Sequence, residues 1–492
     1  MNPRALRETL TRRKGLEHGE PFPRGRDRVA MLYPSPYRAG MSSLGFQWIA
    51  TLLAEAGFGV ERVFLPDDPE AWRKARLPPL SIETQTPLGT FPLLAVSVAY
   101  ELELAGLVEV LRLAGIPPLR RDRNEGHPKV LIGGPLTFSN PLPCAPFADA
   151  MIFGEADDVV VPAVAGFFDT GSLDHVASLP GGWTPEQGAA TVPVAKADDT
   201  HLPARSRIWT REAELTDMIL VEGERGCHRA CSFCVMRRST NGGMRLVSPD
   251  RLLELIPEEA PRIGLVGAAI SDHPQLVGLL ERIVESGRGV GISSLRADRV
   301  ALKPDIPRLL RKGGYQTLTV ASDAASQRLR RQLQKGTTEG HLLACAEAAK
   351  EHGYRQLKVY MMLGVPGEGE ADIEELIAFT RRLAEIHPTA LGIAPFVPKF
   401  NTPMDRAEFA GIKVVEGRLE RVREGLRGTR VEVRPTSARW AWVEARLAQG
   451  GPLAGEAVMR AVEAGGSFAA WKQALGEAGV EEPQRAAVGT LG

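Results

Sequence analysis

The sequence predicts an α/β protein with two successive series of alternating strands and helices, followed by a helical C-terminal region. Apolar runs of strand length alternate with helical stretches, as in domains built on a parallel sheet. Several runs end in glycine-rich or polar turns, and such sheets bind ligands at the carboxyl ends of their strands. The predicted segments are a lead-in (1–28), a doubly wound α/β domain (29–170), a linker (171–215), a second α/β domain (216–410) and a helical region (411–492).

Composition and charge are those of an ordinary globular protein. The 492 residues suffice for two or three domains, with 43% hydrophobic and 24% charged residues. Basic and acidic residues balance at 60 each, so no whole-chain field favours nucleic acid or an anionic membrane. No apolar run has the roughly 20 residues of a membrane-spanning helix, and no signal-peptide run begins the chain. We therefore expect a cytoplasmic protein with no membrane span, and no nucleic-acid-binding domain is evident.

The first series contains five apolar runs that are typical of buried parallel strands. Ser97 lies at the end of the third run, Gly133 and Gly134 follow the fourth, and Gly154 follows the fifth. Glycines at such turns allow a close approach of the backbone. The expected strands lie at 28–33, 60–65, 93–98, 129–132 and 150–153.

Three of the five cysteines lie within eight residues, as Cys227, Cys231 and Cys234 at CxxxCxxC spacing. Thiolates suit zinc or iron–sulfur clusters, which usually take four of them. Three clustered ligands without a nearby fourth leave one metal position open, which implies chemistry. A zinc site would need a fourth ligand, and His228 is strained as a co-ligand because it adjoins Cys227. A disulfide is unexpected without secretory features. The motif therefore predicts a [4Fe–4S] cluster.

The second series begins at Met218 and again alternates strands with helices. Ser248, Pro249 and Asp250 are a favoured N-cap, first-turn proline and first-turn acid for a helix. Another helix is expected from Thr338 to Gly353, a C-cap residue. The expected strands of this series lie at 218–221, 263–267, 290–294, 316–321, 356–363 and 391–397.

The cysteine spacing, with Phe233 before the last cysteine, resembles the signature of radical S-adenosylmethionine (SAM) enzymes. In that family the amino and carboxylate groups of the methionine moiety chelate the open iron. The resemblance implies a partial (β/α)6, TIM-like barrel with its chemistry at the carboxyl ends of the strands. It also implies SAM as a ligand and an external electron donor of the flavodoxin or ferredoxin type.

Further segments resemble the nucleoside-binding motifs of this family, in the expected order. Two departures stand out: Asp323 replaces the usual glutamate, and the GGE-type motif after the second strand reads Gly267-Ala268-Ala269, without a carboxylate. Arg330 is expected to pair with the methionine carboxylate, with Lys335 as a second candidate. The SAM contacts implied by the resemblance are Phe233, Gly267, Ser294, Arg296, Asp323, Ser326, Arg330, Gly364, Gly367, Glu368, Phe396 and Val397.

The N-terminal domain resembles the Rossmann-like, cobalamin-binding-type domain that precedes the barrel in one large subgroup of the family. The resemblance lies in Ser97, Gly133, Gly134 and Gly154, which it implies as cobalamin contacts. The DxHxxG motif, which gives cobalt a histidine in some cobalamin proteins, is replaced by the loop 35–40. The alternative is a Rossmann-like domain that only packs against the barrel.

The resemblance predicts a radical SAM enzyme that cleaves SAM to a 5′-deoxyadenosyl radical and, with cobalamin, methylates an unactivated carbon of a small-molecule or macromolecular substrate. One alternative is a cobalamin-independent rearrangement or cyclisation, and another is a non-catalytic iron–sulfur protein for electron transfer or partner binding. The methylthiotransferases share parts of the barrel but need three N-terminal cysteines for a second cluster. Only Cys144 is available here.

Overall fold

The computed structural model describes residues 2–188, 192–236, 243–293 and 295–480. The chain divides into two compact units, the first comprising Met1–Leu220 with Arg446–Gly492 and the second Val221–Ala445. Within the described residues, no helix is long and apolar enough to span a membrane.

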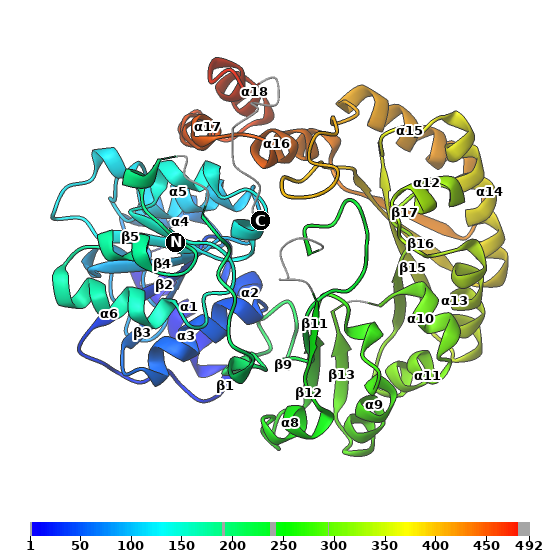
Figure 1. Cartoon of the computed structure of the whole chain (residues 1–492), viewed down its shortest axis with the longest axis horizontal. Coiled ribbons are helices and arrows are strands. Elements are labelled where there is room, and N and C mark those ends of the chain that lie inside the picture. Colours follow the sequence, from blue (N-terminus) through cyan, green and yellow to red (C-terminus); the bar gives the residue numbers. More distant parts are fainter. Residues whose placement is uncertain (1, 189–191, 237–242, 294, 481–492) are drawn as a thin grey trace. The chain divides into compact units, whose positions relative to one another are not determined.

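A six-stranded sheet with the order β3-β2-β4-β5-β6-β7 forms the centre of the first unit (Figure 1). The first five of these strands in space are parallel, and only β7 runs antiparallel to its neighbour β6. This is the order of a doubly wound, flavodoxin-like sheet, whose direction of winding reverses between β2 and β4. The strands are β2 (Arg28–Tyr33), β3 (Gly59–Phe64), β4 (Leu93–Ser97), β5 (Lys129–Gly133), β6 (Ala150–Ile152) and β7 (Gly182–Trp183).

The five strands predicted for this region are confirmed to within a residue or so at each end. Two short strands that were not predicted are also present: β1 (Glu17–Gly19) pairs antiparallel with β8 (Ile208–Thr210). The predicted lead-in and the predicted linker thus each contribute one strand to this pair. The helices of this part are α1 (Pro3–Gly15), α2 (Tyr37–Gly40), α3 (Leu44–Glu55), α4 (Pro69–Ala75), α5 (Glu103–Leu113) and α6 (Val160–Thr170).

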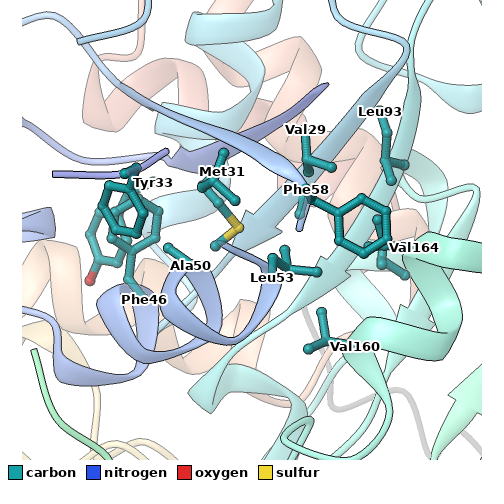
Figure 2. Packing of buried hydrophobic residues seen from close by; sticks show 14 of the residues in the cluster. Val29, Met31, Tyr33, Phe46, Ala50, Leu53, Phe58, Leu93, Val160 and Val164 are labelled. Carbon is teal, nitrogen blue, oxygen red and sulfur yellow. The ribbon is translucent and has the colours of Figure 1, made fainter. Parts of the chain in front are cut away.

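Helices α3 and α6 cover one face of this sheet (Figure 2). Val29 and Met31 of β2 point toward Leu53 of α3, and Val164 of α6 joins the same cluster. All four side chains are at most 2% exposed. Burying each such side chain contributes roughly 1.5–3 kcal/mol to stability. This packing holds the strands in place, and with them the edge of the sheet where the glycine turns lie.

The C-terminal region contains the helices α16 (Ala438–Ala448), α17 (Pro452–Glu463) and α18 (Phe468–Glu477). Helix α17 contacts α5 and the 3₁₀ segment η4 (Leu142–Phe147), so the end of the chain completes the first unit. The Asn140 side chain donates to the carbonyls of Ala448 (3.0 Å) and Gly450 (2.8 Å), which satisfies the end of α16.

Among the described residues, the second unit is built on two larger sheets and one short hairpin. One sheet has the order β13-β12-β9, and the other is the parallel sheet β14-β15-β16-β17. A parallel bridge between Arg296 and Ala321 links them, and helices cover their outer side (Figure 1). The strands are β9 (Met218–Glu222), β12 (Arg262–Val266), β13 (Gly289–Ile292), β14 (Thr317–Ala321), β15 (Gln356–Leu363), β16 (Thr389–Pro395) and β17 (Val431–Pro435), with a hairpin of β10 (Glu224–Gly226) and β11 (Met244–Leu246).

All six predicted strands of this series are present, and a further short strand within the C-terminal region, β17, joins the barrel sheet. Ser248 and Thr338 cap their helices as expected, by accepting from Arg251 N and His341 N, both at 3.3 Å. The α/β fold with a partial barrel is therefore confirmed. The helices are α8 (Pro249–Glu254), α9 (Leu276–Glu285), α10 (Ala297–Leu302), α11 (Asp305–Lys312), α12 (Gln327–Gln332), α13 (Glu339–Glu351), α14 (Glu370–Ile386) and α15 (Ile412–Gly425).

Candidate functional site

The three cysteines of the motif line one cavity of about 320 Å³ in the second unit. Their loop follows β10, and the other walls come from the carboxyl ends of β12, β13 and β14. Phe233, predicted beside the last cysteine, lines the same cavity. The cysteine loop therefore lies where a (β/α) barrel carries its chemistry.

Burial raises the pKa of Cys227 and Cys234, and the charges of the neighbouring thiols raise it further. Without a metal these two groups are thiols at neutral pH. A metal must therefore displace their protons, as is usual for cysteine ligands. The other two cysteines, Cys144 and Cys345, are buried elsewhere, and burial raises the pKa of both.

The donor set fits a cluster better than a single ion. In the described part of the chain, no three His, Cys, Asp or Glu side chains are grouped to hold one metal ion. Each cysteine of a [4Fe–4S] cluster binds a different iron, so these thiols need only share a cavity. Cys227, Cys231 and Cys234 share one.

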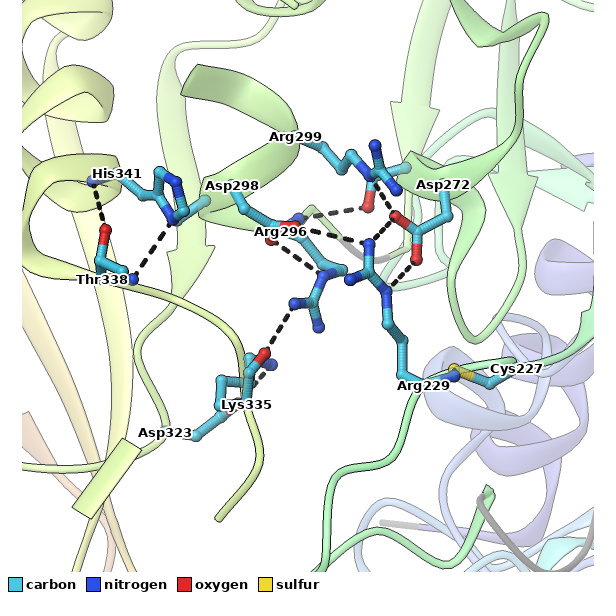
Figure 3. A network of polar contacts seen from close by, with 12 residues as sticks. Cys227, Arg229, Asp272, Arg296, Asp298, Arg299, Asp323, Lys335, Thr338 and His341 are labelled. Carbon is cyan, nitrogen blue, oxygen red and sulfur yellow. Dashed lines mark hydrogen bonds and ion pairs between the residues drawn. The ribbon is translucent and has the colours of Figure 1, made fainter. Parts of the chain in front are cut away.

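Arg229, inside the motif, ties the cysteine loop to the barrel (Figure 3). Its backbone N–H donates to Cys227 Sγ at 3.4 Å. Its guanidinium donates to both carboxylate oxygens of Asp272, from Nε at 2.7 Å and from Nη2 at 2.5 Å. Arg299 binds the same carboxylate. Burial alone would raise the pKa of Asp272, but hydrogen bonds and charges of the two arginines hold it at about 2. The spacing of the cysteine motif did not predict this interaction of Asp272 with Arg229 and Arg299.

Two basic residues, Arg296 and Lys335, also line the cavity. Arg296 donates from Nε to Asp298 (2.9 Å) and from Nη2 to the carbonyl of Lys335 (2.7 Å). The Lys335 ammonium forms an ion pair with Asp323, without the alignment of a hydrogen bond. All of these residues except Asp298 line the cavity.

The backbone explains why an aspartate stands at position 323. Asp323 has a φ of 63°, in the left-handed region. Its N–H and that of Ser322 both donate to the carbonyl of Tyr360, at 3.1 and 2.8 Å. A short polar side chain tolerates this conformation better than the longer glutamate of the family pattern.

Several other residues predicted to contact SAM form hydrogen bonds within the turns of the barrel in this structure. Arg330 is 1% exposed and donates to Ser322 Oγ at 3.2 Å. Ser326 caps α12 by accepting from Leu329 N at 3.2 Å. Glu368 accepts from Gly364 N at 2.9 Å.

Gly364 and Gly367 have positive φ, at 84° and 79°, and Phe396 is 1% exposed. Among the described residues, the cavity lining does not include Ser326, Arg330, Glu368, Gly364, Gly367, Phe396 or Val397. Ser294 lies outside the described residues. Their contacts with SAM stay predictions.

Glu224 is a residue that the motif did not single out. It lies three residues before Cys227 and is 0% exposed. Its Oε1 accepts from Ala269 N at 2.6 Å, and burial raises its pKa to about 7. A Cβ atom at Gly267 would lie 2.3 Å from this oxygen, so a larger residue there would displace the carboxylate from its present position.

The glycines predicted as cobalamin contacts in the first unit differ in how closely other atoms of the chain approach them. A Cβ at Gly134 (φ 104°) would lie 2.7 Å from the Val98 carbonyl oxygen, and one at Gly154 (φ 98°) 2.3 Å from Val194 Cγ1. These glycines serve close contacts within the chain. At Gly133, which pairs with Ser97, the nearest atom would be 3.8 Å away, so this position is not crowded by the chain.

The fold and this cavity define the class: an α/β protein with three clustered cysteines at the carboxyl ends of a partial barrel. Residues 222–380 match the sequence model of the radical SAM superfamily. Residues 45–172 match the model of the N-terminal region of radical SAM proteins. The chain belongs to the radical SAM superfamily and is a radical SAM enzyme.

Relatives extend this assignment. An uncharacterized protein of Methanocaldococcus jannaschii is 26% identical over 81% of this chain and 84% of its own length. The ribosomal protein uS12 methylthiotransferase RimO of Anaeromyxobacter sp. (strain Fw109-5) is 25% identical over 53% of this chain and 57% of its own length.

Among solved structures, the cobalamin-dependent SAM radical enzyme OxsB, with aqua-cobalamin bound, has a TM-score of 0.51 at 15% identity. The match covers 74% of this chain and 53% of the OxsB chain. The chain thus spans about half of the OxsB structure, and at this identity the likeness shows the fold alone.

Proposed function

We propose that the chain binds one [4Fe–4S] cluster through Cys227, Cys231 and Cys234 and cleaves SAM to a 5′-deoxyadenosyl radical. The observation that carries the proposal is the single cavity that all three cysteines line at the carboxyl ends of the strands. When bound and reduced by an external flavodoxin- or ferredoxin-type donor, such a cluster supplies the electron for this cleavage.

The chain's own residues hold and orient the reactants. Arg229 fixes the cysteine loop through the buried Asp272 carboxylate. Arg296 and Lys335 bring N–H donors to the cavity lining beside their partners Asp298 and Asp323, and these donors suit the carboxylate of the methionine moiety. Cys231 is 7% exposed, which limits the access of water.

We propose further that the first unit binds cobalamin and that the reaction methylates an unactivated carbon of the substrate. Three features support this: the flavodoxin-like strand order, the room at Gly133 and the likeness in fold to OxsB. Cobalamin, when bound, supplies the methyl group. The close packing at Gly134 and Gly154 favours a second candidate, a cobalamin-independent rearrangement or cyclisation.

One metal analysis tests both parts of the proposal. The protein is reconstituted anaerobically with iron, sulfide and hydroxocobalamin, desalted, and assayed for iron and cobalt per chain. We expect about four irons in wild type and a large loss in Cys227→Ala, Cys231→Ala and Cys234→Ala. Cys144→Ala and Cys345→Ala are the matched controls and should keep their iron.

Cobalt reports on the first unit separately. Gly133→Leu fills the open space, so we expect it to lose cobalt while it keeps its iron. Wild type without cobalt would contradict the cobalamin part and favour the second candidate. Equal iron in wild type and in all three motif variants would contradict the cluster proposal.

A further inference from the structure

Glu224 presents a buried carboxylate directly behind the cavity wall. Its side chain crosses from β10 to the turn after β12, where Oε1 accepts from Ala269 N at 2.6 Å. Ala268 and Ala269 of the same turn line the cavity with the three cysteines. The carboxylate thus lies one residue layer away from the space in which a ligand would bind.

The second oxygen of this carboxylate is unsatisfied. Among the described residues, Glu224 Oε2 is buried and has no hydrogen-bond partner. A buried acceptor without a donor costs about 1–3 kcal/mol, and more when it carries charge. Glu222 and Asp272 add negative charge nearby, and burial together with this charge favours the protonated form. A cation at the turn would relieve both costs.

The sequence of the turn makes room for this side chain. Gly267-Ala268-Ala269 carries no acid, and a Cβ at Gly267 would overlap the Glu224 carboxylate at 2.3 Å. Glycine at this position and glutamate at 224 are therefore a matched pair. The negative charge that the turn lacks reaches it from the strand that leads into the cysteine loop.

We propose that Glu224 is the positioning residue for the ammonium group of SAM, acting through the turn 267–269. The inference rests on the proposed function, because it requires SAM in this cavity. Arg296 and Lys335 also line this cavity, and although they pair with Asp298 and Asp323, they carry further N–H donors suited to the carboxylate of the same methionine moiety. A carboxylate behind the turn and basic donors elsewhere in the cavity lining would favour one orientation of this zwitterion.

The test compares two ligands. Anaerobically reconstituted protein, without reductant, is dialysed to equilibrium against SAM or against the SAM analogue in which hydrogen replaces the α-amino group. In Glu224→Gln, which keeps an acceptor for Ala269 N, we expect SAM affinity to fall about tenfold or more. The affinity for the deaminated analogue should change by about twofold or less, because it carries no ammonium group.

Three further substitutions distinguish the effect of the Glu224 charge from an effect on local structure. Glu222→Gln removes a neighbouring carboxylate that is already paired with Arg225, and both affinities should stay near wild type. Ala268 is exposed and lines the cavity, so Ala268→Glu returns a carboxylate to the turn. In the Glu224→Gln background it should restore SAM affinity, whereas Ala268→Gln should not.

The outcomes separate this inference from the proposed function. Equal losses for both ligands in Glu224→Gln, or unchanged SAM affinity, would overturn the role of Glu224 while wild type still binds SAM. Failure of cluster-loaded wild type to bind SAM would overturn the proposed function and the inference with it.

Discussion

Asp272 joins the cysteine motif to the rest of the second unit through two arginines, Arg229 and Arg299. Its side chain is 0% exposed, so both guanidinium groups would lose an ionic partner if the charge were removed. Because a buried ion pair broken on one side leaves an uncompensated charge, this carboxylate matters more than the many surface pairs of the chain.

Asp272→Asn should lower the free energy of unfolding at pH 7 by on the order of 2 kcal/mol. The pKa of Asp272 is held at about 2, below that of an unfolded aspartate. Its contribution is therefore complete above pH about 4 and lost as the pH falls toward 2. Urea unfolding of both proteins at pH 7, 5 and 3 should show a difference that shrinks at the lowest pH.

The matched control is Glu374→Gln, which removes a half-exposed partner of Arg421. It should change stability by about 1 kcal/mol or less. An Asp272→Asn protein as stable as wild type at pH 7 would show that the anchor carries no net stabilisation.

At the scale of single residues, the sequence predicted the three cysteines as cluster ligands because their spacing is a local feature of the chain. It predicted Arg330, with Lys335 as a second candidate, as the partner of the methionine carboxylate; Arg330 is buried and donates to Ser322, Lys335 lines the cavity, and the choice between them stays a prediction. Side-chain direction depends on tertiary packing that spacing does not encode. Glu224 was missed for the same reason, since its partner Ala269 lies 45 residues along the chain.

The strands and their turns show which glycines the fold itself requires. Gly133 and Gly134 are adjacent at the end of β5, yet only Gly134 has a positive φ and a crowded Cβ position. A pair of neighbouring substitutions therefore separates backbone strain from the room left for a ligand.

Gly134→Ala should lower the free energy of unfolding by about 1–3 kcal/mol, because it combines left-handed strain with overlap on the Val98 carbonyl. Gly133→Ala should stay within about 0.5 kcal/mol, since its Cβ meets nothing closer than 3.8 Å. Urea unfolding monitored by circular dichroism measures both. Equal effects would contradict this assignment of the two glycines.

Both strand series were predicted from apolar runs because buried parallel strands carry a strong local signal. The short pairs β1–β8 and β10–β11 were not, because three-residue strands are fixed by their partners rather than by their own pattern. The pairing of β17 with β16 likewise depends on a distant contact. The local sequence pattern thus predicted the longer strands. Contacts with distant parts of the chain determined which short segments paired as additional strands.

On the scale of the whole molecule, the first unit is discontinuous. Residues 446–492 group with residues 1–220, although the second unit separates them along the chain. Helix α17 packs closely there, since a Cβ at Gly455 would lie 2.2 Å from the Pro143 carbonyl oxygen. Each unit carries one part of the proposed chemistry, the cobalamin site in the first and the cluster with SAM in the second.

The central claim is that the cysteine cavity initiates radical chemistry. Reconstituted wild type, Cys231→Ala and the control Cys345→Ala are incubated anaerobically with SAM and dithionite, and 5′-deoxyadenosine is quantified. We predict that wild type and Cys345→Ala form 5′-deoxyadenosine and that Cys231→Ala forms none. Wild type that holds a full [4Fe–4S] cluster and binds SAM but forms no 5′-deoxyadenosine would contradict the account.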